Sequence, residues 1–115
     1  MAEAPSVITP LTYEILLALA SQECHGYGII KEIEERAGEA SAPSTGALYL
    51  ALQRMESDGL IEEAPGRPTS GDDARRRYYR LTRRGREAAK AESARLAALV
   101  AAARRKRLLP ASADA

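Results

Sequence analysis

The 115-residue sequence is poor in the side chains on which most enzymes and metalloproteins depend. Its only cysteine, Cys24, excludes an internal disulfide and fits a reducing compartment, although a redox-sensing role for the thiol stays open. Its only histidine, His25, is the neighbour of Cys24, and two ligands do not fill a zinc site, which takes about four. No nucleophile motif and no phosphate-binding glycine loop appears in the sequence. We therefore expect neither an enzyme nor a bound metal or cofactor.

Phenylalanine and tryptophan are absent as well, so leucine, isoleucine, alanine and a few tyrosines must form the core. Such a core is modest, and burying a further apolar face against a second subunit would help to stabilise it. No apolar run approaches the ~20 residues of a membrane span, and residues 1–10 lack the basic-then-apolar order of a signal peptide. We expect a cytoplasmic protein of one domain with an appended element and no membrane partner.

The net charge of +1 conceals an asymmetry along the chain. Up to Pro65 there are three basic residues against eleven acidic ones, whereas from Gly66 onward there are fourteen basic residues against five acidic ones. A basic half makes the chain a candidate for binding a polyanion. The alternative is that the charges, although segregated in the sequence, mix in space.

Residues 44–60, STGALYLALQRMESDGL, predict a central helix. Leu48, Leu52 and Met55 recur at helical spacing and share one face that can be buried. Ser44 is suited to cap the start, and Gly59 to end the helix in the left-handed conformation. The outer face begins with small and hydroxyl residues beside unpaired N–H groups, as the start of a DNA-recognition helix does. An ordinary core helix with a solvated outer face explains this stretch equally well.

Two further helices are expected before this one, over about residues 10–20 and over residues 26–37, with a polar break at residues 21–25. Their expected apolar faces consist of Leu11, Ile15, Leu16 and Leu19 in the first helix and of Tyr27, Ile30, Ile33 and Ala37 in the second. Together with the central helix they predict a helix-turn-helix.

Two short β-prone segments, residues 60–64 and 77–81, flank a loop rich in proline and glycine and are expected to pair as a hairpin. Such a hairpin is marginal alone and has to pack on the helices. It carries arginines that can neutralise phosphates or enter a minor groove: Arg67, Arg75, Arg76 and Arg77. A basic hairpin after a helix-turn-helix defines a winged helix; the alternative is a solvated arginine-rich loop.

Residues 83–109 predict a long final helix, with Thr82 as its N-cap and a length of roughly 40 Å, too long for so small a domain to cover. An apolar stripe runs through its second half and includes Leu96, Leu99, Val100 and Ala103. A stripe that projects beyond a domain is usually an oligomer contact, so we expect a homodimer. The alternative is a basic amphipathic helix on a membrane surface, which the lack of aromatic anchors disfavours.

With these segments placed, the sequence resembles the PadR family of bacterial and archaeal transcriptional regulators. The matching phrases are ILLALA at 15–20, HGYGI at 25–29, GALYLALQRMESDGLIEE at 46–63 and RRRYYRLTRRG at 75–85. The resemblance implies a mainly α, α+β winged-helix fold with a three-helix core, a two-stranded wing and a long C-terminal dimerisation helix. The parts implied are a flexible N-terminal tail (1–9), a winged-helix DNA-binding domain (10–82), the dimerisation helix (83–109) and a flexible C-terminal tail (110–115).

The resemblance also implies a homodimer that binds a pseudo-palindromic operator in double-stranded DNA, usually as a repressor. Arg54 matches a common basic position of the recognition helix, where it serves either the DNA backbone or a salt bridge. The remaining DNA contacts implied by position are Ser44, Thr45, Gly46 and Tyr49 at the start of that helix and Arg75, Arg76 and Arg77 in the wing. Packing roles are implied for Tyr79, Leu81 and Gly85.

Two departures from the family pattern limit what is carried over. Ala47 stands where a threonine-like residue is usual, which removes a hydroxyl contact. The final helix has no tryptophan, so effector binding by stacking on tryptophan is not carried over. An apolar small-molecule effector between the final helices remains a hypothesis, motivated only by the alanine-rich stripe. The alternative to a DNA-binding regulator is a winged-helix module that binds another protein.

Overall fold

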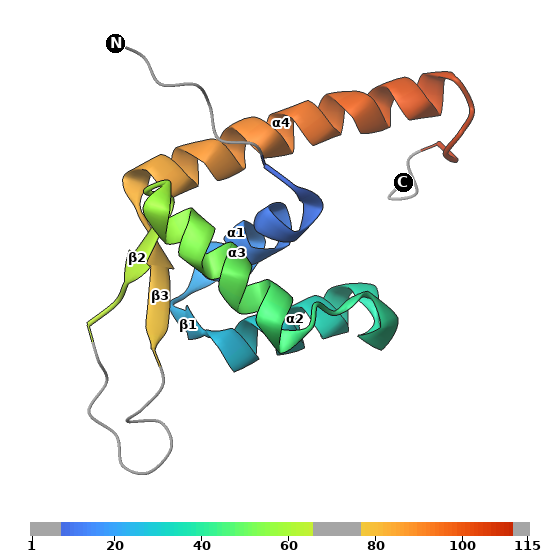
Figure 1. The fold of residues 1–115 in the computed structure, drawn as a ribbon. Helices are drawn as coiled ribbons and strands as arrows, with labels where there is room; N and C mark the ends of the chain where they lie inside the picture. The colour runs from blue at the N-terminus through green and yellow to red at the C-terminus, as the bar shows by residue number, and fades with distance from the viewer. Residues whose placement is uncertain (1–7, 66–76, 112–115) are drawn as a thin grey trace.

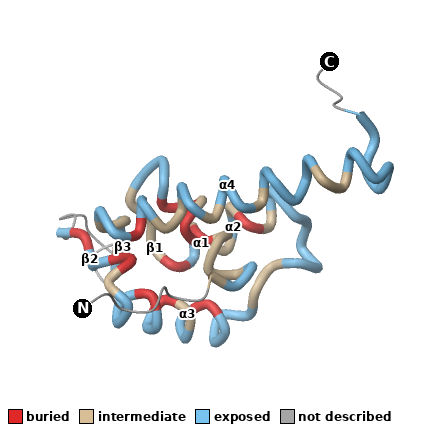
Figure 2. Tube along the Cα trace, turned by 90° about the horizontal axis from the view of Figure 1, so that it is seen from above, coloured by how far each residue is buried: buried red, intermediate tan, exposed pale blue. Residues whose placement is uncertain are grey.

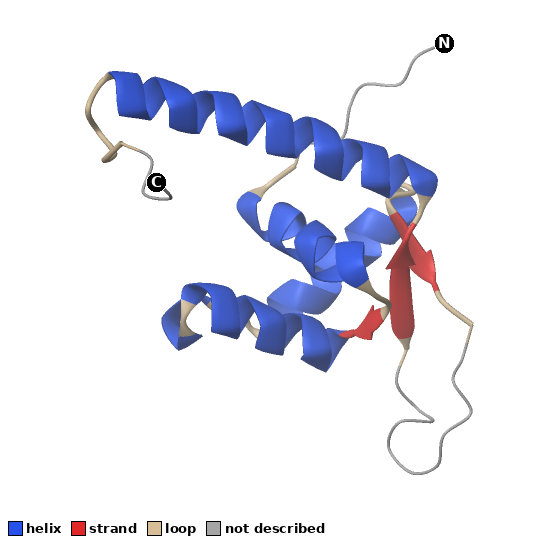
Figure 3. Cartoon of the chain, turned by 180° about the vertical axis from the view of Figure 1, so that it is seen from behind, coloured by secondary structure: helices blue, strands red, loops and turns tan. Residues whose placement is uncertain are grey.

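The computed structural model describes residues 8–65 and 77–111. Helices dominate, and a small antiparallel sheet stands at one end of the helical layer (Figures 1 and 3). In chain order the elements are α1 (Pro10–Ser21), β1 (Cys24–His25), α2 (Gly26–Ala37), the short 3-10 helix η1 (Glu39–Ser41), α3 (Thr45–Ser57), β2 (Ile61–Glu63), β3 (Tyr78–Leu81) and α4 (Arg83–Arg105). This order and arrangement confirm the predicted winged helix with a long final helix.

Side-chain caps explain where the α-helices begin. In each case a side-chain atom of the residue before the helix accepts a hydrogen bond from a backbone N–H in the first turn. The capping residues are Thr9 for α1, His25 for α2, Ser44 for α3 and Thr82 for α4. The caps at Ser44 and Thr82 were predicted from the sequence and are confirmed.

The end of α3 is set by Gly59, as predicted. Gly59 has φ +77°, its N–H donates to the carbonyl of Glu56, and the N–H of Leu60 donates to the carbonyl of Met55. This double closure satisfies carbonyls that a helix end otherwise leaves unpaired, and the left-handed conformation favours glycine. The chain therefore leaves α3 abruptly and enters β2.

One hydrophobic core joins the helices to the sheet, and Figure 2 shows it as a red inner layer. It is made of Ile15, Leu16, Ala18, Leu19, Ile29, Ile33, Leu48, Leu52, Met55, Leu60, Ile61 and Tyr79. The predicted inner face of α3 is thus buried as expected, and so is most of the predicted face of α1. Leu11 and Leu81 pack against this core while remaining partly exposed.

The predicted apolar face of α2 is partly wrong. Ile29 and Ile33 are fully buried, whereas Tyr27 is 57% exposed and Ala37 is exposed as well. Ile33 was predicted on this face and is buried, and the predicted Ile30 packs against the core while partly exposed, whereas the buried Ile29 was not predicted. The buried face is thus rotated toward Ile29, a rotation that the sequence pattern does not show. The position of α1 and α3 against α2 decided this rotation.

The predicted two-stranded hairpin is confirmed as β2 and β3, and within the described residues a further strand extends the sheet to three. β3 lies in the centre and pairs antiparallel with β2 on one side and with β1 on the other. Cys24 faces Tyr79 and His25 faces Tyr78, so the segment predicted as a polar break supplies an edge strand. Two residues are too few to show a strand period, and their partner lies more than 50 positions away in the sequence.

The start of α4 closes the domain. The hydroxyl of Thr82 donates to the carbonyl of Gly59 over 2.6 Å, and the N–H of Thr82 donates to the carbonyl of Leu60. A Cβ on Gly85 would lie 1.9 Å from the Leu60 carbonyl oxygen, so only glycine allows this approach. The packing role implied for Gly85 is therefore confirmed.

The far end of α4 differs from the expectation. The helix ends at Arg105, four residues before the predicted residue 109, and Arg107 adopts φ +64°. The N–H of Leu108 donates to the carbonyl of Ala103, which closes the helix end in the same way as at Gly59. A left-handed arginine is uncommon, which explains why the sequence showed no stop signal here.

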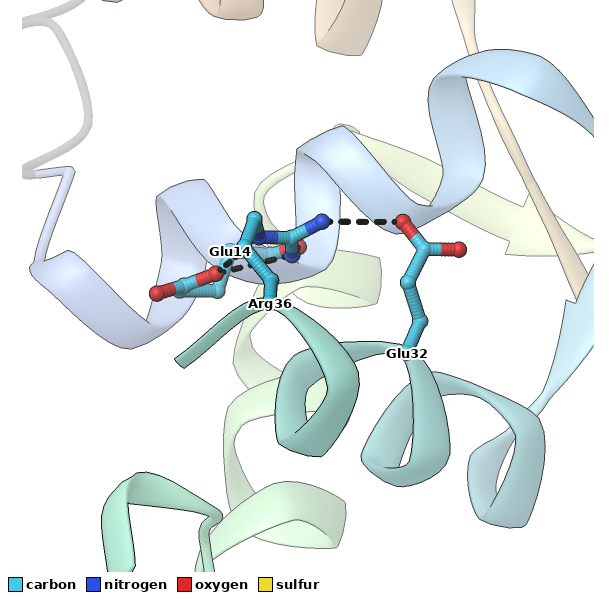
Figure 4. A network of polar contacts seen from close by, with 3 residues as sticks. All are labelled: Glu14, Glu32 and Arg36. Atoms are coloured by element: carbon cyan, nitrogen blue, oxygen red, sulfur yellow. Dashed lines mark hydrogen bonds and ion pairs between the residues drawn. The ribbon is translucent and has the colours of Figure 1, made fainter. Parts of the chain in front are cut away.

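Arg36 ties α2 to α1, as Figure 4 shows. Its Nε donates to Oε1 of Glu14 over 2.8 Å, and its Nη1 donates to Oε2 of Glu32 over 3.0 Å. The same guanidinium also reaches the backbone carbonyl of Glu14 at 3.3 Å. Because one planar group spans two helices, it helps to set the angle between the helices that support α3.

Among the helices of the described residues, none combines the length and the apolar character needed to cross a membrane.

Candidate nucleic-acid interface

The core leaves the outer face of α3 uncovered. The exposed positions from Thr45 to Gln53 are Thr45, Gly46, Ala47, Tyr49, Leu50 and Gln53. In Figure 2 the helix is red along its inner side and pale blue along its outer side. The face is exposed because Leu48, Leu52 and Met55 anchor the opposite side in the core.

The N-terminus of α3 is open for close approach. Oγ of Ser44 accepts the N–H of Ala47 over 3.1 Å, so the cap orders the first turn. A Cβ on Gly46 would meet nothing within 4 Å, which leaves the backbone of this turn accessible. The positive end of a helix dipole and its backbone N–H groups favour a phosphate in such a position.

Tyr49 lies between the outer face and the neighbouring helix. It is 45% exposed, yet its ring lies over Gly26 at the start of α2. A Cβ on Gly26 would stand 2.7 Å from Cζ of this ring, so glycine at that position makes room for the tyrosine. Tyr49 is therefore held by α2 while its remaining surface faces outward.

Charge on α3 is distributed unevenly along the helix. No acidic residue occurs from Thr45 to Gln53, whereas Glu56 and Asp58 are exposed at the far end. Arg54 is exposed on the flank that turns toward the start of α1, where it lines a shallow groove together with Thr9 and Asp58. The first half of α3 is thus the half that a polyanion can approach without repulsion.

Only part of the predicted basic wing falls within the described residues. Arg67, Arg75 and Arg76 lie outside them. Arg77 is exposed, and its Nε lies 3.7 Å from Oε2 of Glu63 on β2. A hydrogen bond with Tyr79, followed by the charge of Glu63, raises the pKa of Arg77, so its guanidinium stays charged.

The arginine within β3, Arg80, also meets a glutamate of β2. Nε of Arg80 donates to Oε2 of Glu62 over 2.8 Å, and the two residues face each other in the strand register. Exposed pairs of this kind contribute only about 0–1 kcal/mol, so a phosphate can compete for the arginines. Arg77 and Arg80 are thus both paired with glutamates of β2, one of the red strands in Figure 3, and the glutamates offset their positive charge.

The predicted dimerisation residues lie on the outer part of α4. Leu99 is 54% exposed and Val100 is 38% exposed, while Leu96 and Ala103 are half-buried. At spacings of three and four residues they form one stripe, which continues the side of α4 that packs on the domain through Gly85 and the alanines after it. Leu99 and Val100 are thus the most exposed members of the stripe within the described chain.

The described residues contain no group of three or more metal-ligating side chains. Cys24 is half-buried, and its burial is the main reason why the pKa of its thiol is raised, with the charge of Glu32 adding to it. A raised pKa lowers the thiolate fraction, which is the reactive form. The environment therefore favours a packing role for Cys24 over a redox role.

Two exposed side chains of the outer face were not among the predicted DNA contacts. Leu50 is 50% exposed, and Gln53 is exposed one turn further along. A helical wheel drawn away from Leu48, Leu52 and Met55 places both near the centre of the outer side. The periodicity used to predict the core therefore already contained this signal.

Comparisons with known proteins agree with this geometry. The model of the PadR-like family of transcriptional regulators matches residues 15–91. A PadR family transcription regulator from Clostridium difficile is 29% identical, with a TM-score of 0.73 over 83% of this chain and 95% of that chain. The PadR of Bacillus subtilis, solved in complex with operator DNA, is 24% identical, with a TM-score of 0.56 over 68% of this chain and 43% of that chain, and shows the fold alone.

An uncharacterized protein of Lysinibacillus sphaericus is 32% identical over 72 residues, which are 63% of this chain and 64% of the relative. The match to this curated relative thus spans less than two thirds of its length. The family model, in contrast, covers more than half of the present chain and includes α2, α3, the sheet and the start of α4. The protein therefore belongs to the PadR-like family of transcriptional regulators, and it is a regulator rather than an enzyme.

Proposed function

We propose that the protein represses transcription as a homodimer, with each α3 in a major groove of a pseudo-palindromic operator. The observation that carries this proposal is the uncovered outer face of α3, whose first three turns bear no acidic side chain. The width of a major groove accommodates one α-helix, and a recognition helix contacts base edges mainly through its N-terminal residues. The Bacillus subtilis relative was solved in complex with operator DNA, and this supports a nucleic-acid partner.

Within this proposal the predicted residues divide into two kinds of contact. At the start of α3 the backbone around Ser44, Thr45 and Gly46 meets a phosphate, and the exposed side of Tyr49 lies against the DNA strand beside it. Arg54 contacts the sugar-phosphate backbone of the DNA from one flank of α3. Contacts of this kind position a protein on DNA without reading its sequence.

The wing adds electrostatic attraction. Arg77 exchanges its exposed partner Glu63 for a phosphate, and Arg67, Arg75 and Arg76 act from the same hairpin. Each neutralised phosphate releases counterions, so the affinity falls as salt rises. The protein-interaction module is the alternative that this salt dependence tests.

The dimer forms through the stripe on α4. Packing Leu96, Leu99, Val100 and Ala103 against their counterparts in a second copy removes exposed apolar surface from water. The two α3 helices of such a dimer would enter grooves about 34 Å apart, one turn of DNA. An apolar effector bound between the α4 helices would change this separation, and titration of the DNA complex with each candidate compound tests it.

Fluorescence anisotropy with DNA from the region upstream of the coding sequence tests the proposal, with a scrambled duplex as control and a series of salt concentrations. We expect selective binding with a steep salt slope. Replacing Arg75, Arg76 and Arg77 with alanine should reduce that slope by up to about one log-log unit per lost phosphate contact. Lys90→Ala, which removes an exposed charge from α4, is the matched control.

Tyr49→Ala tests the contact at α3 itself. We expect a loss of operator affinity with the dimer retained and the melting temperature little changed, because nearly half of the tyrosine is exposed. Equal binding of both duplexes by the wild-type protein, with no change of slope in the wing variant, would instead support a protein partner. A Tyr49→Ala variant that fails to fold would place Tyr49 in the core.

A further inference from the structure

The outer face of α3 also restricts which bases the protein can read, an inference that rests on the proposed function. We infer that Gln53 and Leu50 together recognise an A·T pair and its neighbouring thymine in each half of the operator. Gln53 would bond the adenine edge, and Leu50 would contact the C5-methyl group of thymine. These two side chains would determine the sequence specificity of the recognition helix.

The first argument is what the face lacks. From Thr45 to Gln53 the helix carries no arginine and no lysine, and these are the side chains that commonly bond the O6 and N7 acceptors of guanine. Arg54 follows this run and lines both the groove against the start of α1 and the depression that Leu50 and Gln53 share. Direct reading of guanine by residues 45–53 is therefore disfavoured by their composition, and Arg54 is the cationic side chain that borders Leu50 and Gln53.

The second argument is the pair of side chains near the centre of the outer face. Leu50 and Gln53 are three residues apart, so they stand side by side on the helix. Both line one shallow depression of the surface, which Arg54 and the residues at the far end of α3 complete: Glu56, Ser57 and Asp58. A glutamine amide can donate to N7 of adenine while it accepts from the N6 amino group. An exposed leucine has the apolar surface that the methyl group of thymine needs.

The third argument is access. Gly46 lies one turn before Leu50, and a side chain added there would meet no atom of the protein within 4 Å, so the outer side of this turn is open. The ring of Tyr49 lies against Gly26 of α2, so α3 packs closely on α2 beside this face. Both features let Leu50 and Gln53 approach base edges without a rearrangement of the helix.

The experiment starts with selection of binding duplexes from a random pool by the wild-type protein. In the selected operator, each thymine is then replaced in turn by uracil, which lacks the methyl group, and each adenine by 7-deazaadenine, which lacks N7. We expect one thymine per half-site whose replacement weakens wild-type binding roughly 3- to 10-fold, and one adenine whose replacement weakens it roughly 10-fold.

Variants assign these losses to the two side chains. In Leu50→Ala the uracil replacement should have no further effect, and in Gln53→Ala the 7-deazaadenine replacement should have none. Gln22→Ala, which removes an exposed glutamine at the end of α1, should keep both losses. Circular dichroism melting checks that each variant is folded.

Each outcome decides something different. Selective binding with no effect of either base analogue, or with selected half-sites read through guanine alone, would overturn the inference while the proposed function stands. Losses that persist unchanged in Leu50→Ala and Gln53→Ala would assign the contacts to other residues and overturn it too. A wild-type protein that selects no sequence at all would overturn the proposed function and this inference with it.

Discussion

The two halves of α4 belong to one straight helix but have opposite surroundings (Figure 1). In the first half Gly85 is buried under Leu60, and Oη of Tyr13 lies 2.6 Å from Oγ of Ser93, a hydrogen bond between α1 and α4. In the second half Leu99 and Val100 on the same side are exposed. The outer end of the helix is mostly pale blue in Figure 2. One continuous face of α4 thus packs on the domain in the first half and stays exposed, and so available to a partner, in the second half.

This difference separates two sources of stability. The first half of α4 stabilises the monomer, because its contacts are made within one chain. The second half is expected to stabilise mainly an assembly, because Leu99 and Val100 stay exposed in the described chain. Substitutions in the two halves should therefore affect different measurements.

The largest expected effect comes from the first half. Gly85→Ala places a methyl group 1.9 Å from the backbone oxygen of Leu60, which side-chain rotation cannot relieve. We expect the free energy of unfolding to fall by about 3 kcal/mol or more, measured by urea denaturation. Gly46→Ala is the control, since its methyl group meets nothing, and it should gain up to about 1 kcal/mol. Equal stability of Gly85→Ala and wild type would contradict the close packing.

The second half is tested by Leu99→Lys. A charge in the stripe should raise the dissociation constant of the dimer roughly 100-fold, because an unpaired charge at the centre of an interface is costly to bury. Sedimentation equilibrium measures this change, while circular dichroism should show the helical content of the wild type. Ala98→Lys places the same charge on the opposite side of the helix and should leave the dimer intact. Dissociation by both variants alike would remove the stripe from the interface.

The hydrogen bond of Tyr13 with Ser93 lies at the end of the first half, next to the boundary with the second half. Tyr13→Phe should lower the free energy of unfolding by about 0.5–1 kcal/mol, because the bond is exposed to solvent. A double-mutant cycle with Ser93→Ala isolates the interaction from other effects of each change. Additive losses in the two single variants would show that the hydroxyl groups do not couple.

The smallest effect is expected at Glu92 and Arg95, next to this boundary. Nε of Arg95 donates to Oε1 of Glu92 over 3.0 Å, and this hydrogen bond is the main reason why the pKa of Glu92 is lowered. A lowered pKa in the folded state gives stability above the unfolded pKa, which is lost as the pH falls through the folded pKa. In Arg95→Ala the pKa of Glu92, followed by NMR titration, should rise; an unchanged value would show that the pair does not form in solution.

Much of the fold could be predicted from local signals. The inner face of α3, the caps at Ser44 and Thr82 and the left-handed end at Gly59 depend on residues close in sequence. Such features follow from helical spacing and from hydrogen bonds of a side chain to its own turn. For the candidate interface, the same spacing showed where the outer face of α3 lies.

What the sequence determined by itself was therefore the set of helices, the order of a winged helix and the presence of an uncovered stripe on α4. Only the tertiary structure decided that β1 joins the sheet, that Ile29 rather than Tyr27 faces the core, and that Arg77 and Arg80 meet glutamates of β2. The physical reason is range: caps and helical faces arise within a few residues, whereas strand pairing, choice of face and ion pairing depend on segments brought together by folding.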